Sequence, residues 1–328
     1  MTEPSETDPS TMRGPRQVAV LTHMGRPAAI AAATRLIDGL LAAGITSAMP
    51  KGDADCLEPR LAATVLSLDP PGEPVPDLEL MIVLGGDGTI LRGTEWVLSA
   101  DIPLLGVNLG HVGFLAEAES SEIDSIVARV VDRSYRVEER STVEVVLREC
   151  ECESGEVAWR SYAINEVSIE KASRERMLEV LVEIDGRPLS RWACDGVLVA
   201  TPTGSTAYAF SAGGPVIWPN VDALLVVPLS AHALFARPLV IGPTSRVVVQ
   251  LIERSQTDGV VWCDGRRSTE LRAGLEIEIA QGAHRLRLAR LSEAPFTDRL
   301  VNKFGLRVEG WRGAAEVSAG GSASWDAR

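Results

Sequence analysis

Apolar and polar positions change their spacing along the first 140 residues of the chain. Short apolar runs predict buried strands, and longer segments with apolar residues at helical spacing predict helices. The first predicted helix ends at Gly44. The predicted strands are 17–23, 78–84 and 102–110, and the predicted helices are 27–44, 90–99 and 122–134. Strands that alternate with helices predict a parallel, doubly wound α/β sheet.

The pattern changes near Tyr135 to short alternating segments separated by glycine-bearing turns, which predicts a mostly β second domain. Its predicted strands lie within 141–150, 161–171, 178–189, 195–201, 246–253, 259–266, 275–281 and 284–291. After Pro295 the pattern is helical again, and we expect this helix to pack back on the first domain. The predicted organisation is a tail at 1–16, an α/β domain at 17–138 with a returning helix at about 295–311, a β-rich domain at 139–294, and a tail at 312–328.

Composition narrows the classes of partner. The 328 residues are 45% hydrophobic and carry a formal charge of −13, which disfavours a nucleic-acid partner because phosphate neutralisation needs a basic surface. No apolar stretch is long enough to cross a bilayer, and the polar N-terminus lacks the apolar region of a signal peptide. The cysteines and histidines are scattered, with no zinc-binding spacing, which predicts reduced thiols and a cytoplasmic protein.

Residues 81–90 read MIVLGGDGTI, a buried strand that runs into a glycine-rich turn and then a helix. At the carboxyl end of such a strand, glycines let backbone N–H groups approach phosphate oxygens, and the helix N-terminus adds positive charge. Asp87 would repel phosphates there unless it held a metal ion or took a proton, and both tasks belong to phosphoryl transfer. The alternative is a tight left-handed turn with a solvated carboxylate.

Two further segments add polar groups to the second domain. Asn165 and Glu166 interrupt an alternating strand at 163–171, and such a pair can hold a ribose or a base edge, or can be a polar pair at a strand edge. Residues 194–219 read CDGVLVATPTGSTAYAFSAGGPVIWP, a buried strand followed by many hydroxyls and glycines. That density suits a pocket for a sugar, the alternative being a loop that caps a helix.

The order of these motifs resembles that of the bacterial NAD kinases. GGDGT alone is shared with lipid kinases and phosphofructokinases, which lack the TGSTAY loop. NLGHVGFLAE at 108–117 and SAHALFARPLV at 230–240 are also similar to segments of the NAD kinase family, so the likeness covers roughly residues 17–310. It implies transfer of the γ-phosphate of ATP to the 2′-hydroxyl of the adenosine ribose of NAD, giving NADP, with a divalent metal ion such as Mg²⁺ or Mn²⁺.

The resemblance also implies roles for individual residues. Asp87 would accept the hydroxyl proton, Gly88 would approach the nucleotide through its backbone, and Asp195 would reach a neighbouring subunit's pocket. The other nucleotide-binding residues would be Arg92, Asn165, Glu166, Arg176, Ser205, Thr206, Ala207, Tyr208 and Ser211.

Some positions also have plain structural interpretations. Arg92 suits a solvated helix face, and Phe114 suits a core position better than a stacking site for adenine. Asp264-Gly265 resembles a late family motif, but Asp-Gly is also a common hairpin turn. Ala193 stands where many relatives carry a basic residue, which leaves the choice between NAD and NADH open.

Two other functions remain as alternatives. A related lipid kinase would need affinity for a membrane surface, which the negative charge and the lack of a basic amphipathic helix argue against. A nucleotide-sensing module without turnover would need a damaged acid or loop, whereas Asp87 and residues 203–211 are intact. The donor, ATP or inorganic polyphosphate, is also open. Relatives form homodimers and homotetramers, so we expect one of these assemblies.

Overall fold

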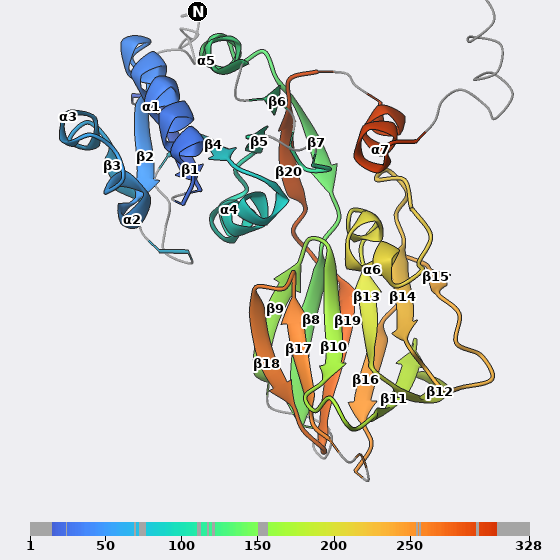
Figure 1. Cartoon of the computed structure of the whole chain (residues 1–328). Helices are drawn as coiled ribbons and strands as arrows, with labels where there is room; N and C mark the ends of the chain where they lie inside the picture. Colours follow the sequence, from blue (N-terminus) through green and yellow to red (C-terminus); the bar gives the residue numbers. More distant parts are fainter. Residues whose placement is uncertain are drawn as a thin grey trace, which may run out of the picture.

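The structure is a computed structural model that describes residues 15–23, 25–68, 70–71, 77–109, 113–116, 118–119, 122–149, 157–253, 255, 257–292 and 295–306. The predicted tails at 1–16 and 312–328 lie outside the described residues, apart from Pro15 and Arg16. Figure 1 shows an α/β domain, coloured mainly blue to teal, above a β-rich domain that contains the green, yellow and orange strands. No helix in the described part of the chain is both long and apolar enough to span a membrane.

The first domain is built on one sheet with strand order β3-β2-β1-β4-β5-β20-β7, and β6 pairs with β5. The strands are β1 (Gln17–Thr22), β2 (Thr46–Pro50), β3 (Leu66–Leu68), β4 (Leu78–Leu84), β5 (Leu104–Asn108), β6 (Ala118–Glu119), β7 (Arg136–Arg140) and β20 (Leu286–Arg290). The pairs are parallel except for β20 with β7, which is antiparallel.

Helices cover both faces of this sheet because successive strand residues point to opposite faces. Val18 and Val20 of β1 pack in a cluster with α1 and α5, whereas Ala19 and Leu21 pack with α4. The helices are α1 (Pro27–Ala42), α2 (Lys51–Ala54), α3 (Pro59–Ala62), α4 (Asp87–Ala100) and α5 (Ile123–Val131). The predicted doubly wound α/β domain is confirmed, and α4 begins at Asp87, inside the glycine-rich motif.

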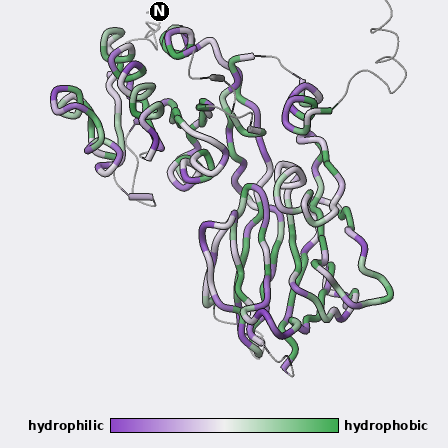
Figure 2. Tube along the Cα trace, in the orientation of Figure 1, coloured by the Kyte–Doolittle hydropathy of each residue, from purple (hydrophilic) through white to green (hydrophobic). Residues whose placement is uncertain are grey.

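The second domain contains two six-stranded sheets, ordered β15-β14-β13-β10-β17-β18 and β12-β11-β16-β19-β8-β9. Their strands are β8 (Val143–Glu149), β9 (Val157–Ala163), β10 (Glu166–Lys171), β11 (Leu178–Ile184), β12 (Arg187–Cys194), β13 (Gly196–Ala200), β14 (Leu224–Leu229), β15 (Leu239–Ile241), β16 (Val247–Leu251), β17 (Gly259–Cys263), β18 (Arg267–Leu271) and β19 (Leu275–Gln281). One buried cluster takes residues from both sheets, including Val145, Val167 and Val261, so the sheets form a sandwich. Figure 2 shows the hydrophobic residues concentrated along these strands.

Two boundaries differ from the sequence prediction. The chain rejoins the first sheet at Leu286, before residue 295, because Leu288 and Ala289 of β20 are buried against opposite faces of that sheet. The segment 161–171 is two strands and not one. It breaks at Ile164 and Asn165, where the chain passes from one sheet of the sandwich to the other.

Candidate active site

The glycine-rich turn connects buried β4 to α4, whose N-cap is Gly86. A Cβ added to Gly86 or Gly88 would meet no atom within 4 Å, so the backbone at both positions faces open space. Gly85 differs, because its Cβ would lie 2.5 Å from Oγ1 of Thr89. The turn therefore closes tightly on one side and leaves the backbone at the start of α4 accessible on the other.

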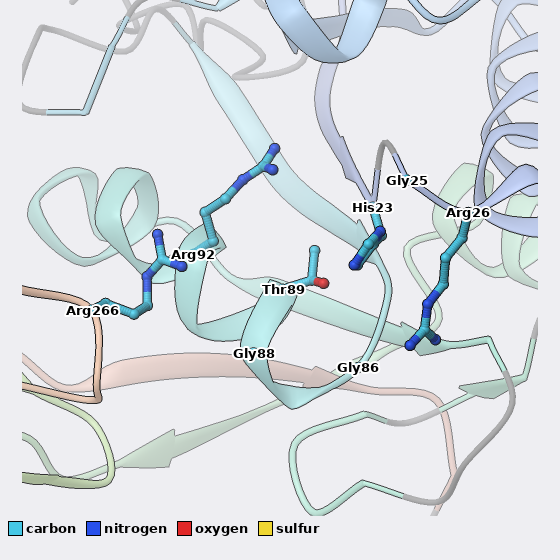
Figure 3. Close-up of a pocket in the computed structure, with 8 residues that line it drawn as sticks. All are labelled: His23, Gly25, Arg26, Gly86, Gly88, Thr89, Arg92 and Arg266. Carbon is cyan, nitrogen blue, oxygen red and sulfur yellow. The ribbon is translucent and has the colours of Figure 1, made fainter.

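A pocket of about 580 Å³ lies over this turn. It is lined by His23, Gly25, Arg26, Gly86, Gly88, Thr89, Arg92 and Arg266. Figure 3 shows Arg92 and Arg266 on one side of the pocket and His23 and Arg26 on the other, with the glycine turn between them. Three guanidinium groups and the α4 N-terminus supply hydrogen-bond donors to this pocket, which suits a chain of phosphates although Asp53 and Glu95 pair with two of the arginines.

The two domains meet at this pocket. Arg266 belongs to the turn between β17 and β18 of the second domain, whereas Glu95 lies on α4 of the first. The Arg266 Nε donates to the Glu95 Oε1 at 2.8 Å. This ion pair brings a cation of the β-rich domain to the phosphate pocket of the α/β domain.

Arg92 is held by a carboxylate that the sequence analysis did not identify. Asp53 is only 2% exposed, and its Oδ2 accepts hydrogen bonds from Arg92 Nη2 at 2.6 Å and from the Thr22 backbone at 2.9 Å. A single aspartate outside any motif gives no signal in one sequence. The structure shows that it orients the arginine whose side chain lines the pocket.

Asp87 faces a segment from the next strand connection. Its Oδ2 accepts a hydrogen bond from the Phe114 backbone at 3.2 Å, and its Oδ1 accepts one from Leu115 at 3.3 Å. A Cβ on Gly113 would lie 2.3 Å from the Asp87 Oδ1, so only glycine permits this approach. Phe114 is 9% exposed and packs against Phe296 and Phe304, which agrees with the core interpretation of this ring.

A buried aspartate shapes the connection between β9 and β10. The Asp264 carboxylate accepts hydrogen bonds from the Ile164 backbone at 2.9 Å and the Asn165 backbone at 2.7 Å, and it pairs with Arg267 at 3.1 Å. Asp264 and Gly265 both have positive φ, at 54° and 63°, as a type I′ hairpin turn requires. The Asp-Gly pair is therefore a hairpin turn whose acid also fixes the chain at Asn165.

The hydroxyl-rich loop packs directly on that connection. Thr201 donates through Oγ1 to the Ile164 carbonyl at 2.6 Å and through its backbone to the Asn165 carbonyl at 2.9 Å. A Cβ on Gly204 would lie 1.9 Å from the Asn165 oxygen. The Asn-Glu pair and the loop, separate motifs in the sequence, thus form one surface.

Within this loop the hydroxyls have different surroundings. Ser205, in the short 3₁₀ helix Gly204–Thr206, is fully buried. Its hydroxyl donates to the Pro202 carbonyl at 2.6 Å and accepts from the Ile217 backbone at 2.8 Å. Thr206 donates to the Thr203 carbonyl at 3.1 Å. The Ser205 hydroxyl therefore holds the loop, and the contribution of this residue to nucleotide binding stays a prediction.

Other residues of the loop line a second pocket. Tyr208 and Ser211 lie on the short helix α6 (Tyr208–Ser211) and line a pocket of about 460 Å³ together with Asp195, Lys171 and other residues. Asp195 pairs with Lys171 at 2.5 Å, and this lysine lowers the pKa of the Asp195 carboxyl. Ala207 precedes α6 directly, whereas Arg176 is exposed and does not line either of these two pockets.

Glu166 is a buried acid in this region. Burial raises the pKa of its carboxyl to about 7, the nearby Asp264 carboxylate adds to the rise, and a hydrogen bond from the Tyr208 backbone opposes it. The group therefore titrates near neutral pH beside residues that the sequence predicts to bind a nucleotide.

Glu166→Gln should flatten the dependence of stability on pH. Because the folded-state pKa of about 7 lies above the unfolded value of about 4.3, protonated Glu166 contributes stability that is complete below about pH 4. That contribution, at most about 3–4 kcal/mol, is lost as the pH rises through about 7. Thermal unfolding between pH 5 and 8 measures it, with Glu175→Gln on an exposed turn as the control. If the melting temperatures of Glu166→Gln and the wild type changed with pH in the same way across this range, the pKa assigned to Glu166 would be contradicted.

Comparison with known proteins agrees with this arrangement. Residues 75–135 match the family model described as the ATP-NAD kinase N-terminal domain, and residues 164–291 match the ATP-NAD kinase C-terminal domain. The chain is 53% identical over 308 residues to the NAD kinase of Thermobifida fusca, covering 93% of this chain and 94% of that one. It is 52% identical over 299 residues to NAD kinase 2 of Streptomyces coelicolor, covering 91% and 97%.

Solved structures show the same fold. A yeast NADH kinase complexed with NADH superposes with a TM-score of 0.78 at 24% identity, covering 91% of this chain and 90% of that one. An NAD kinase from Archaeoglobus fulgidus in complex with ATP superposes with a TM-score of 0.63 at 24% identity, covering 88% and 97%. Since the ordered motifs, the two-domain fold and relatives identical at more than half of the aligned positions all agree, this chain belongs to the ATP-NAD kinase family.

Proposed function

We propose that the chain phosphorylates NAD with ATP and that Asp87 is the catalytic base. The 2′-hydroxyl oxygen of the adenosine ribose attacks the γ-phosphorus, the bond to the bridging oxygen breaks, ADP leaves, and the Asp87 carboxylate takes the hydroxyl proton. The observation that carries this proposal is the position of Asp87, the first residue of α4, between two glycines that line a pocket rich in arginine.

We assign the arginine-lined pocket to the phosphates of the donor. Arg26, Arg92 and Arg266 can neutralise the phosphate charge, and the open backbone at Gly86 and Gly88 can donate to phosphate oxygens. The lining consists of three arginines, three glycines, Thr89 and a single ring, the His23 imidazole, so it offers far more donors to phosphates than rings to a base. We propose inorganic polyphosphate as a second donor beside ATP.

A divalent ion, Mg²⁺ or Mn²⁺, would enter with these phosphates. Among the described residues no group of three or more His, Cys, Asp or Glu side chains could hold a metal ion. Asp87 is the acid of the turn. A site with this one carboxylate fits an ion that takes most of its ligands from substrate phosphates and water, as Mg²⁺ usually does. When bound, the ion would neutralise charge that develops on the transferred phosphoryl group.

We assign the second pocket and its surroundings to NAD. Asn165 and Glu166 lie against the loop that carries Tyr208 and Ser211, and amide, carboxyl and hydroxyl groups suit the edges of an adenosine. Thr206 and Ala207 would contribute loop backbone to the same nucleotide. Arg176 remains a proposal from the family resemblance alone.

A second copy of the chain is the proposed protein partner. The arm between β14 and β15 extends from the sandwich (Figure 1) and carries the fully exposed Leu234 and the half-exposed Phe235. Exposed apolar side chains of this size are typical of a protein interface. The arm begins beside the second pocket, since Leu229 and Ser230 line it, so a homodimer or homotetramer would build on this edge. The free thiols Cys56, Cys194 and Cys263 support the cytoplasm as the compartment.

A turnover assay tests the proposed function. Purified protein is mixed with Mg²⁺, NAD and ATP, and NADP is detected with an NADP-specific dehydrogenase. The proposal expects product that depends on enzyme and ATP. Binding of NAD with no product from ATP or polyphosphate, and none with NADH as the acceptor, would favour the nucleotide-sensing alternative.

Arg92→Ala and Asp53→Asn should both raise the KM for ATP. A charge-assisted hydrogen bond contributes about 1.5–3 kcal/mol, so loss of the Arg92 contact should raise KM about 10- to 100-fold, with a smaller rise for Asp53→Asn. Arg35→Ala, which removes an exposed pair with Asp124, is the matched control. An unchanged KM in Asp53→Asn would show that Asp53 does not orient Arg92 for the donor.

A further inference from the structure

The C-terminal helix α7 (Phe296–Phe304) touches both halves of the proposed active site. Phe296 and Phe304 both contact Phe114, with ring centroids 5.9 and 5.8 Å away, and Phe114 belongs to the segment that faces Asp87. Phe304 also contacts Phe210 of α6 at 4.6 Å, and Phe296 contacts Trp218 at 5.2 Å. One short helix thus packs on the partner segment of Asp87 in the first domain and on the nucleotide loop of the second (Figure 1).

Arg299 extends from this helix to the backbone behind Asp87. Its Nη1 donates to the carbonyl oxygens of Phe114 and Ala116, each at 3.3 Å. The carbonyl between them, that of Leu115, accepts from Arg290 at 3.4 Å. Arginines therefore hold three successive carbonyl groups of the segment whose N–H groups bind Asp87.

One peptide group connects Arg299 to Asp87. The carbonyl of Phe114 and the N–H of Leu115 belong to the same planar unit. The carbonyl end accepts from Arg299 and the N–H end donates to Asp87 Oδ1, each at 3.3 Å. A rotation of this unit would break both hydrogen bonds and would turn a carbonyl oxygen toward the carboxylate, which would repel it. The Arg299 guanidinium beside the Phe114 carbonyl oxygen also polarises the Leu115 N–H, which strengthens the hydrogen bond that this N–H donates to Asp87.

We propose that Arg299 is a positioning residue of phosphoryl transfer. It fixes the Phe114–Leu115 peptide group with its N–H toward Asp87, so that the carboxylate stays directed at the hydroxyl whose proton it takes. The aromatic contacts of α7 tie this orientation to the position of the nucleotide loop. The inference rests on the proposed role of Asp87 and extends it to a residue outside every motif of the sequence.

The test compares Arg299→Ala and Arg299→Lys in the turnover assay of the full-length chain. Because a displacement of about 1 Å at a catalytic group can lower a rate about 10²-fold, we expect Arg299→Ala to lower kcat about 10- to 100-fold. The KM for ATP should stay within about twofold, since no residue of α7 lines the phosphate pocket. Arg299→Lys keeps a cationic donor for one carbonyl and should recover part of kcat. A merely structural role would not produce this division between kcat and KM.

The controls separate the possible failures. Arg35→Ala repeats the substitution at an exposed ion pair, and thermal unfolding shows whether each variant is folded. Should Arg299→Ala not fold, Arg299→Lys and Arg299→Gln carry the same comparison, with lysine expected to be the more active. A wild-type kcat in folded Arg299→Ala, or equal losses in the Lys and Gln variants, would overturn the inference. Assayed alongside, an active Asp87→Asn would instead overturn the proposed base and the inference with it.

Discussion

We expect Asp87→Asn to lower kcat for NADP formation by about 10²–10⁴-fold, because a positioned general base contributes a rate factor of that size. The carboxamide has the shape of the carboxylate and keeps one oxygen to accept from Phe114 or Leu115, so the fold should persist. It cannot take the proton of the 2′-hydroxyl. The coupled dehydrogenase assay measures kcat, and thermal unfolding confirms that the variant is folded.

Asp101→Asn is the matched control at the other end of the same helix. Asp101 caps the C-terminus of α4 with a positive φ of 52°, a conformation that asparagine tolerates, and it lies 3.4 Å from Arg287 on the surface. Its activity should equal that of the wild type. A kcat for Asp87→Asn within a few fold of that control would remove Asp87 from the role of base.

Asp264→Ala should have the largest effect on stability. It would leave the backbone N–H groups of Ile164 and Asn165 and the guanidinium of Arg267 without their shared acceptor. Removing one partner of a buried ion pair costs about 3–5 kcal/mol, so we expect a loss of that size in the free energy of unfolding. Activity should fall as well, because the same carboxylate fixes the backbone at Asn165. Denaturant unfolding and the turnover assay measure the two effects.

Asp185→Ala isolates the contribution of burial. Asp185 and Gly186 form the same kind of left-handed Asp-Gly turn between β11 and β12, with φ of 53° and 69°, but Asp185 is exposed and accepts from Arg246 and Ser245 at the surface. The backbone strain of alanine at positive φ is common to both variants. Equal losses in Asp264→Ala and Asp185→Ala would show that the turn, and not the buried carboxylate, carries the effect.

Local patterns were sufficient for the features that short segments determine. The alternation of β4 with α4, the open glycines at 86 and 88, and the hairpin at Asp264-Gly265 each depend on a few neighbouring residues, so one sequence predicts them. Hydrophobic periodicity likewise indicates which strands are buried. The order of the motifs along the chain is also a property of the sequence alone, and it is sufficient to indicate the NAD kinase family.

Contacts between distant residues had no such signal. Asp53 orients Arg92 across 39 positions, and Arg299 reaches Phe114 across 185. The continuous alternation of 161–171 hid a change of sheet, because the break at Ile164 depends on Asp264, 100 positions away. The hydrogen bond of the Ser205 hydroxyl also had no local signal, since the Ile217 backbone that it accepts from becomes a neighbour only after the loop folds.

The place of β20 in the first sheet determines the order in which the protein can be completed. Its position between β5 and β7 is an inner one, yet its residues, Leu286–Arg290, follow the whole sandwich in the chain. During synthesis from the N-terminus, both sheets of the sandwich are complete at Gln281, while the earlier domain still lacks an inner strand. Pairings of such high sequence separation form slowly because the intervening chain must first be closed into a loop. The domain that begins first is therefore finished last, and catalytic competence arises only after β20 has left the ribosome.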